Sequence, residues 1–155
     1  MNKEHHYTVN VQWTGNLGTG TSNYTAYSRN HTVQIDHKPD LPGSADKPFR
    51  GDISKHNPED MLLSSLSTCH MLWYLHLCAD AGVIVTAYTD TAEATLVQTE
   101  NGGHFSMANL HPIVTVAANS MIELALQLHH KAHACCFIAN SVNFPVHLFP
   151  KALSQ

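Results

Sequence analysis

The sequence predicts an α+β fold, and three observations carry that prediction. Strand-like alternation occupies the N-terminal part, two long apolar helical segments follow, and a glycine-rich turn lies between them. The expected order is strands, helix, hairpin, helix, strand. With 155 residues, 43% of them hydrophobic, the chain suits a single domain over residues 1–155.

The N-terminal third predicts an antiparallel sheet followed by a loop. Residues 7–13 alternate apolar and polar side chains, which is the period of a half-buried strand. Residues 22–27 and 31–35 give two further strand-like runs after a glycine-rich break. Residues 36–56 contain Pro and Gly with little apolar material, so we expect a long loop, and long loops often carry function.

The first helix has clear start and stop signals. Asn57 is a capping residue, Pro58 suits the first helical position, and two acids follow in the first turn. The helical pattern continues to Ala81, before Gly82, which gives a helix of about 36 Å at 1.5 Å per residue. Apolar residues lie nearly all round it, so we expect it to run through the protein's centre.

The C-terminal half predicts a hairpin, a second helix and a last strand. Residues 91–98 and 111–117 are strand-like and enclose an Asn-Gly-Gly turn signal. Ser120 and Glu123 form a capping box, and the helix then runs to about Cys136. Residues 142–149 give the final strand. One stripe of the second helix holds Ile122, Leu126, His129, His133 and Cys136.

Composition and charge exclude several classes of function. The formal net charge of −4 argues against a nucleic-acid-binding protein. No signal peptide is apparent at the N-terminus, so the expected compartment is the cytoplasm. Residues 61–79 lack charged side chains, but their Ser, Thr and His residues indicate a buried helix and no membrane span. Only 13% of residues are charged, which suggests a surface hidden in an oligomer.

The four cysteines are better suited to thiol chemistry than to a scaffold. They are few for a disulfide framework and lack paired zinc spacing. Cys69 lies in the middle of the first helix, ten residues after Glu59, and Arg50 lies in the preceding loop. Cys78 is turned about 180° from Cys69 on an ideal helix, so we expect a core thiol there. An inert, buried Cys69 is the alternative interpretation.

Two segments carry a resemblance to a known family. Residues 57–63, Asn-Pro-Glu-Asp-Met-Leu-Leu, followed by Cys69, resemble the central helix of the OsmC/Ohr hydroperoxide reductases. Residues 133–141, with Cys136, look like the second-cysteine helix of that family. The resemblance spans residues 13–149. It implies an OsmC-like fold, a curved antiparallel sheet wrapped around two long central helices, in an entwined homodimer.

The resemblance also implies a role for each residue. Cys69 would be the peroxidatic cysteine, Cys136 the resolving cysteine, Glu59 the helix-start carboxylate and Arg50 the arginine of the OsmC branch. The Gly-Gly-Arg turn of the Ohr branch has no counterpart at residues 15–18, and Arg29 is the alternative to Arg50. The implied antioxidant activity reduces organic hydroperoxides, and hydrogen peroxide as a further substrate, with an external dithiol as reductant and without cofactor or metal.

The chemistry explains why such a site needs an arginine. An ordinary thiol with a pKa near 8.5 is only about 3% thiolate at pH 7, and a nearby guanidinium stabilises the anion. We expect Glu59 to hold Arg50 by a bidentate pair. Attack on a peroxide gives a sulfenic acid on Cys69, which Cys136 would condense to a disulfide.

Besides the peroxidase, two other functions stay open: a non-enzymatic binding protein, and a thiol protein that is a redox sensor or a hydrolase. The chain has 13 histidines, and His129, His133 and Cys136 follow one helical stripe, with His70 beside Cys69. These residues suit a non-enzymatic zinc- or small-ligand-binding protein of the same fold. Alternatively, His70 or His133 relays protons or packs near the thiols. The third possibility is that the thiols form a redox sensor or a hydrolase-like nucleophile.

Overall fold

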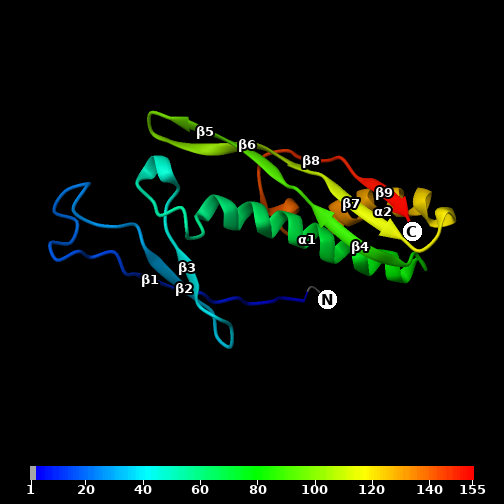
Figure 1. Ribbon diagram of the computed structural model, residues 1–155, viewed down its shortest axis with the longest axis horizontal. Coiled ribbons are helices and arrows are strands. Elements are labelled where there is room, and N and C mark those ends of the chain that lie inside the picture. The colour runs from blue at the N-terminus through cyan, green and yellow to red at the C-terminus, as the bar shows by residue number, and fades with distance from the viewer. Residues whose placement is uncertain (1–2) are drawn as a thin grey trace. The chain divides into compact units, whose positions relative to one another are not determined.

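The computed structural model describes residues 3–155 and divides the chain into two compact units, Met1–Met61 and Leu62–Gln155. Both units contain β-sheet, and the two long helices give the chain the expected α+β class (Figure 1). The expectation of one domain over residues 1–155 stays a prediction.

The first unit contains a three-stranded antiparallel sheet in the order β1-β2-β3. Its strands are β1 (Asn10–Trp13), β2 (His31–Gln34) and β3 (Leu41–Gly43), followed by the short 3-10 helix η1 (Lys47–Phe49). The loop after β1 folds back on itself, and Trp13 Nε1 donates a hydrogen bond to the Ser28 carbonyl at 2.9 Å. Gly15 permits this, because a Cβ there would lie 1.9 Å from that carbonyl oxygen.

Three expectations for the first unit need correction. Residues 22–27 form turns, because Asn23 Oδ1 accepts hydrogen bonds from the Thr25 amide and hydroxyl at 2.9 and 2.7 Å and so competes with strand pairing. The apolar residues around β1 are exposed rather than half-buried, with Tyr7 at 88% and Val11 at 60%. The loop over residues 36–56 contains β3 and η1.

The second unit contains two three-stranded sheets, in the orders β4-β7-β9 and β5-β6-β8. The β4–β7 and β5–β6 pairs are antiparallel, whereas β6–β8 and β7–β9 are parallel. An antiparallel sheet throughout is therefore wrong, while the curvature of the sheet stays a prediction. The strands are β4 (Val85–Asp90), β5 (Glu93–Thr99), β6 (Gly102–Leu110), β7 (Pro112–Val116), β8 (Val146–Leu148) and β9 (Lys151–Ser154).

The hairpin in this unit uses a strand that the alternation did not predict. The partner of β5 is β6, which begins at Gly102 in the turn itself, where φ is +129°. The predicted run at residues 111–117 is β7, and it pairs with β4 instead. The single final strand expected at residues 142–149 is replaced by the short strands β8 and β9.

Helix α1 (Pro58–Asp80) begins and ends close to the predicted positions. Asn57 Oδ1 accepts a hydrogen bond from the Asp60 amide at 2.7 Å, and Gly82 adopts the left-handed conformation with φ +73°. The helix is not buried all round, because Leu72 is 63% exposed. Its buried residues form one stripe: Leu66, His70, Tyr74, Leu77 and Cys78.

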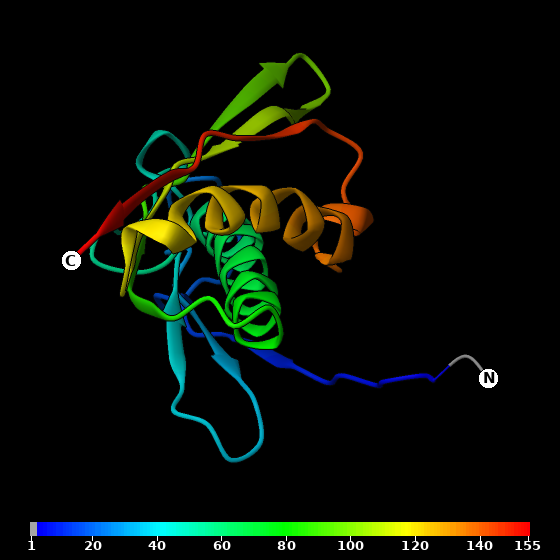
Figure 2. The same cartoon turned by 90° about the vertical axis from the view of Figure 1, so that its right-hand side faces the viewer.

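Helix α2 (Ile122–Cys135) crosses α1, as Figure 2 shows in a view roughly along α1. The predicted capping box does not form, because residues Asn119–Met121 make the 3-10 helix η2 and α2 begins after them without a side-chain cap. A third 3-10 helix, η3 (Ala139–Ser141), follows α2. The buried stripe of α2 includes His129 and is otherwise small or apolar: Ala125, Leu128 and Ala132.

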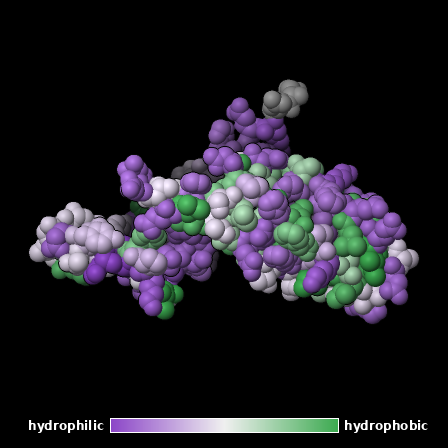
Figure 3. Space-filling model, turned by 90° about the horizontal axis from the view of Figure 1, so that it is seen from above, coloured by the Kyte–Doolittle hydropathy of each residue, from purple (hydrophilic) through white to green (hydrophobic). Residues whose placement is uncertain are grey.

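The hydrophobic core of the second unit lies between the two helices and the β4-β7-β9 sheet. It is formed by Tyr74, Leu77, Cys78, Val83, Val114, Val116, Ala125, Leu128 and Ala132. Other large apolar side chains stay exposed, and apolar patches are visible among polar ones in the space-filling view (Figure 3). Within residues 3–155, neither helix is both long and apolar enough to cross a membrane.

Candidate active site

Cys69 and Cys136 come together in the second unit, although 66 other residues separate them in the chain. Cys69 lies in the middle of α1, and Cys136 is the residue that ends α2. The Cys136 thiol makes a hydrogen bond with the Cys69 side chain, and both cysteines are free thiols. Two helices thus place one half-buried and one buried sulfur in contact.

The chain around Cys136 fixes its position. Its φ of −69° and ψ of 111° end the helix, and its amide donates to the His133 carbonyl. The Ala139 amide donates to Cys136 Sγ at 3.4 Å, and the Asn140 amide donates to the Cys136 carbonyl at 3.0 Å. The sulfur is therefore held by a tight turn that leads into η3.

Burial decides the protonation of Cys136. Burial first, and then the hydrogen bond with Cys69, raise the pKa of the Cys136 thiol to about 11. Cys136 is consequently a neutral thiol at neutral pH. A thiol that stays neutral at neutral pH is a poor candidate for the first attack on a peroxide, because the thiolate is the nucleophile.

The other two cysteines occupy different surroundings. Cys78 belongs to the hydrophobic core and is 1% exposed, as the sequence predicts, and burial raises the pKa of its thiol. Cys135 is the last residue of α2 and is half-buried beside Cys136. Cys78 is a packing residue, whereas Cys135 lies next to the candidate site.

The two candidate arginines lie in the first unit. Arg50 ends η1 with a left-handed backbone, φ +64°, and its side chain is exposed. Arg29 donates hydrogen bonds to the carbonyls of Tyr27 and Tyr24 at 2.7 and 2.8 Å, and its guanidinium lies 4.3 Å from each ring centre. Arg29 is therefore committed to the loop that it closes, and Arg50 is the arginine that remains available for a ligand.

Glu59 lies in the first turn of α1, as predicted. Among the described residues, Glu59 forms no ion pair with Arg50, and its buried Oε2 atom has no hydrogen-bond partner. The predicted bidentate pair is thus not formed in this structure. An unsatisfied buried carboxylate oxygen is costly, so this position favours the approach of a hydrogen-bond donor.

Histidines form a second cluster between the same two helices. His70 Nε2 and His129 Nδ1 lie 3.0 Å apart and share a hydrogen bond, and the Tyr74 ring stacks on His129 at 3.8 Å. The sequence suggests both histidines as zinc ligands, and His70 also as a proton relay or packing residue, but it does not predict that they bond to each other. Across residues 3–155, no group of three or more His, Cys, Asp or Glu side chains is arranged to hold a metal ion.

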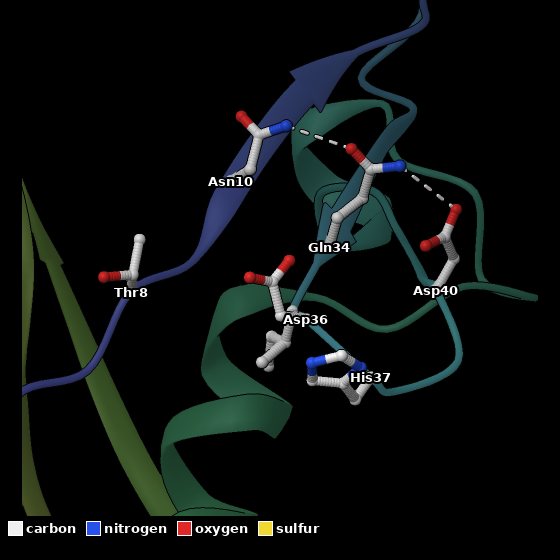
Figure 4. A pocket seen from close by; sticks show the side chains of 7 residues that line it. Thr8, Asn10, Gln34, Asp36, His37 and Asp40 are labelled. Carbon is white, nitrogen blue, oxygen red and sulfur yellow. Dashed lines mark hydrogen bonds between the residues drawn. The ribbon is translucent and has the colours of Figure 1, made fainter.

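A polar pocket lies wholly within the first unit. It has a volume of about 370 Å³ and is lined by the residues shown in Figure 4. Asn10 Nδ2 donates to Gln34 Oε1 at 3.0 Å, and Gln34 Nε2 donates to Asp40 at 3.3 Å (Figure 4). The lining contains no cysteine and no arginine, so the pocket offers no thiol chemistry.

The fold and the site together define a class: α+β proteins that bring two cysteines into contact where two long helices meet. The family model for OsmC-like proteins matches residues 51–148, more than half of the chain. The chain therefore belongs to the OsmC-like protein family. Arg50 lies one residue before the matched span.

Solved structures share this fold. An OsmC-like protein of unknown function from Vibrio cholerae is 28% identical, with a TM-score of 0.85 over 95% of this chain and 99% of that chain. An organic hydroperoxide resistance protein from Elizabethkingia anophelis is 20% identical, with a TM-score of 0.68 over 99% and 100%. One from Legionella pneumophila is 21% identical, with a TM-score of 0.68 over 98% and 100%. No curated protein sequence matches the chain.

Proposed function

We propose that this protein is a thiol-dependent peroxidase that reduces organic hydroperoxides, with Cys69 as the nucleophile and Cys136 as the resolving thiol. The observation that carries the proposal is the contact between their two side chains. The names of the Elizabethkingia and Legionella proteins of the same fold support it. The raised pKa of Cys136 supports the division of labour, because it disfavours Cys136 as the thiolate that attacks first.

The reaction has two steps on the protein. The Cys69 thiolate attacks one peroxide oxygen, the O–O bond breaks, and the departing alkoxide takes a proton to become an alcohol. The Cys136 sulfur then attacks the Cys69 sulfenic acid, water leaves with the Cys136 proton, and a disulfide forms. An external dithiol reduces this disulfide by exchange and restores both thiols.

Arg50 is the proposed activator of this site. Its exposed guanidinium would stabilise the Cys69 thiolate and the charge that develops on the alkoxide, and Glu59 would orient it. Catalytic hydrogen bonds are often long or absent in a free enzyme and form with the substrate. The unpartnered Oε2 atom of Glu59 gives the guanidinium an acceptor to meet.

The surface near the thiols favours an organic substrate. Trp73 follows Cys69 by one helical turn, and Phe137 follows Cys136 directly. Their rings meet edge to face at 5.5 Å, while Phe137 is 66% exposed and Leu72 63% exposed. An apolar group attached to a hydroperoxide would bury part of this surface, whereas hydrogen peroxide has no such group.

The proposed setting is a cytoplasmic homodimer. Thiols that must return to the reduced state after each turnover suit a reducing compartment. Exposed apolar side chains such as Val9, Val11 and Trp13 around β1 suit a surface that a second copy covers. Sedimentation of the purified protein would show a monomer if this part of the proposal is wrong.

Steady-state peroxide consumption tests the proposed activity. With cumene hydroperoxide and excess dithiol, we expect repeated turnover by the natural protein and loss of essentially all turnover in Cys69→Ser. Cys78→Ala is the matched control, because it removes a thiol from the same helix that plays no part in the chemistry. A stoichiometric reaction that stops after one equivalent, despite excess dithiol, would point to a sensor and contradict the proposal.

A further inference from the structure

Two pairs of side chains join α1 to α2 side by side. Cys69 contacts Cys136, and His70, the next residue on α1, bonds to His129 on α2. His129 precedes Cys136 by seven residues, which is about two helical turns. The imidazole pair therefore ties together the same two helices that carry the reactive sulfurs, close to the point where the sulfurs meet.

The imidazole bond is short, directed and shielded. The Nε2 atom of His70 lies 3.0 Å from Nδ1 of His129, and the two ring planes differ by only 9°. The Tyr74 ring covers His129, and all three side chains are at most 1% exposed. A bond of this kind fixes both the distance and the relative orientation of two rings, which apolar contacts do not.

The surroundings keep both rings neutral, and the bond requires that at least one of them is neutral. One imidazole must donate and the other must accept, so protonation of both rings would destroy the bond. Burial is the main cause that lowers the pKa of His70 to about 4 and that of His129 to about 3. At neutral pH the hydrogen-bonded pair is therefore uncharged.

We propose that the His70–His129 bond is a positioning contact that sets the approach of the Cys69 and Cys136 sulfurs. A disulfide forms only within narrow limits of distance and dihedral angle, so a small shift between α1 and α2 would separate the sulfurs. This inference rests on the proposed function for its purpose. The closeness of the two sulfurs can nevertheless be measured without any peroxide.

The test measures how readily the disulfide closes. The purified protein is equilibrated in glutathione redox buffers, and mass spectrometry quantifies the Cys69–Cys136 cross-link, which gives the effective concentration of one thiol at the other. His70→Gln places an amide near the position of Nε2 and keeps a bond to His129, whereas His70→Leu fills the space without one. His130→Gln, at an exposed neighbour on α2, is the control.

We expect His70→Gln and His130→Gln to stay within about threefold of the natural effective concentration. His70→Leu should lower it at least about tenfold, since it removes a bond and leaves His129 without its partner. A folded His70→Leu protein with the natural value would overturn the inference. If His70→Leu does not fold, His70→Asn, whose amide is too short to reach His129, replaces it under the same criterion.

Different results would reject the proposed peroxidase function and the positioning role of the histidine pair. If the natural protein closes the cross-link but consumes no hydroperoxide, the positioning role stands and the peroxidase does not. If the natural protein closes no Cys69–Cys136 cross-link at any redox potential, both are wrong. A low effective concentration in His70→Leu, restored in His70→Gln, would support the positioning role alone.

Discussion

The sulfur pair and the imidazole pair link the same two helices, but burial favours the function of the imidazole pair and opposes that of the sulfur pair. Burial raises the pKa of Cys136 to about 11 and lowers the pKa of His70 to about 4, so both effects favour the uncharged form. Neutrality is sufficient for a histidine bridge. A thiol that attacks peroxide must become an anion, so the sulfur pair needs a cation close to Cys69.

The largest expected effect is on the resolving thiol. Cys136→Ser should still react with one equivalent of hydroperoxide but should lose catalytic turnover, because the thiol that contacts Cys69 is no longer there to close the disulfide. The unresolved sulfenic acid would proceed to sulfinic acid with more peroxide, which adds two oxygen atoms to the Cys69 peptide. Full turnover in Cys136→Ser would show that another thiol, such as Cys135, resolves the intermediate.

Acid should weaken the fold through the imidazole pair. The folded-state pKa values of about 4 and 3 lie below the unfolded value of 6.5, so the neutral rings contribute stability above pH 6.5 that is lost as the pH falls. Between pH 7.5 and 5, urea denaturation should show a loss of roughly 2 kcal/mol for each histidine. Nearby groups also shift these pKa values: His133 lowers and Asp90 raises the pKa of His70. His70 and His130 both lower the pKa of His129.

The matched variant for this measurement is His129→Asn, which keeps a hydrogen-bonding group near the position of Nδ1 but does not titrate. Its free energy of unfolding should fall less between pH 7.5 and 5 than that of the natural protein. Equal losses in the two proteins would contradict the attribution of the acid sensitivity to His129.

The cation should come from Arg50 and not from Arg29. Arg50→Gln should lower kcat/KM for cumene hydroperoxide by about 10- to 100-fold with the fold unchanged, in line with the removal of one electrostatic donor. Arg29→Gln should instead lower the melting temperature, because Arg29 closes a loop through two carbonyls and two tyrosine rings. A well-folded Arg29→Gln protein with the larger loss of activity would reverse the assignment.

The smallest expected effect concerns substrate preference. Phe137→Ala removes an exposed ring beside Cys136 and should lower kcat/KM for cumene hydroperoxide by about three- to tenfold, the effect of losing part of an apolar contact. The value for hydrogen peroxide should not change. Equal losses for both substrates would mean that the ring positions Cys136 and does not bind substrate.

Local signals made the helices predictable from the sequence. Asn57 and Pro58 at the start of α1 and Gly82 after it act within one turn, so the helix has nearly its predicted length. The capping box at Ser120 failed because the same residues also suit a 3-10 turn. The strand pairs were less predictable because most of them are not local: β7 pairs with β4, and β8 and β9 pair in parallel with β6 and β7, all far along the chain.

In the candidate site, the sequence predicted the meeting of the two cysteines but not the contacts of the histidines or of Glu59. Cys69 and Cys136 carried a recognisable pattern, and the structure places their side chains together. The His70–His129 bond was not predictable, because helical spacing says which side chains share a stripe and not which stripe on another helix they meet. The ion pair of Arg50 with Glu59 followed from chemical plausibility alone, and the chain by itself does not form it.

The central claim is that Cys69 and Cys136 form the reactive pair. Peptide mapping by mass spectrometry after one equivalent of cumene hydroperoxide, without reductant, tests it most directly. The account predicts a Cys69–Cys136 cross-link as the main product, with Cys78 and Cys135 still alkylatable. Recovery of Cys69 and Cys136 as unmodified thiols, or of Cys69 cross-linked to another cysteine, would contradict it.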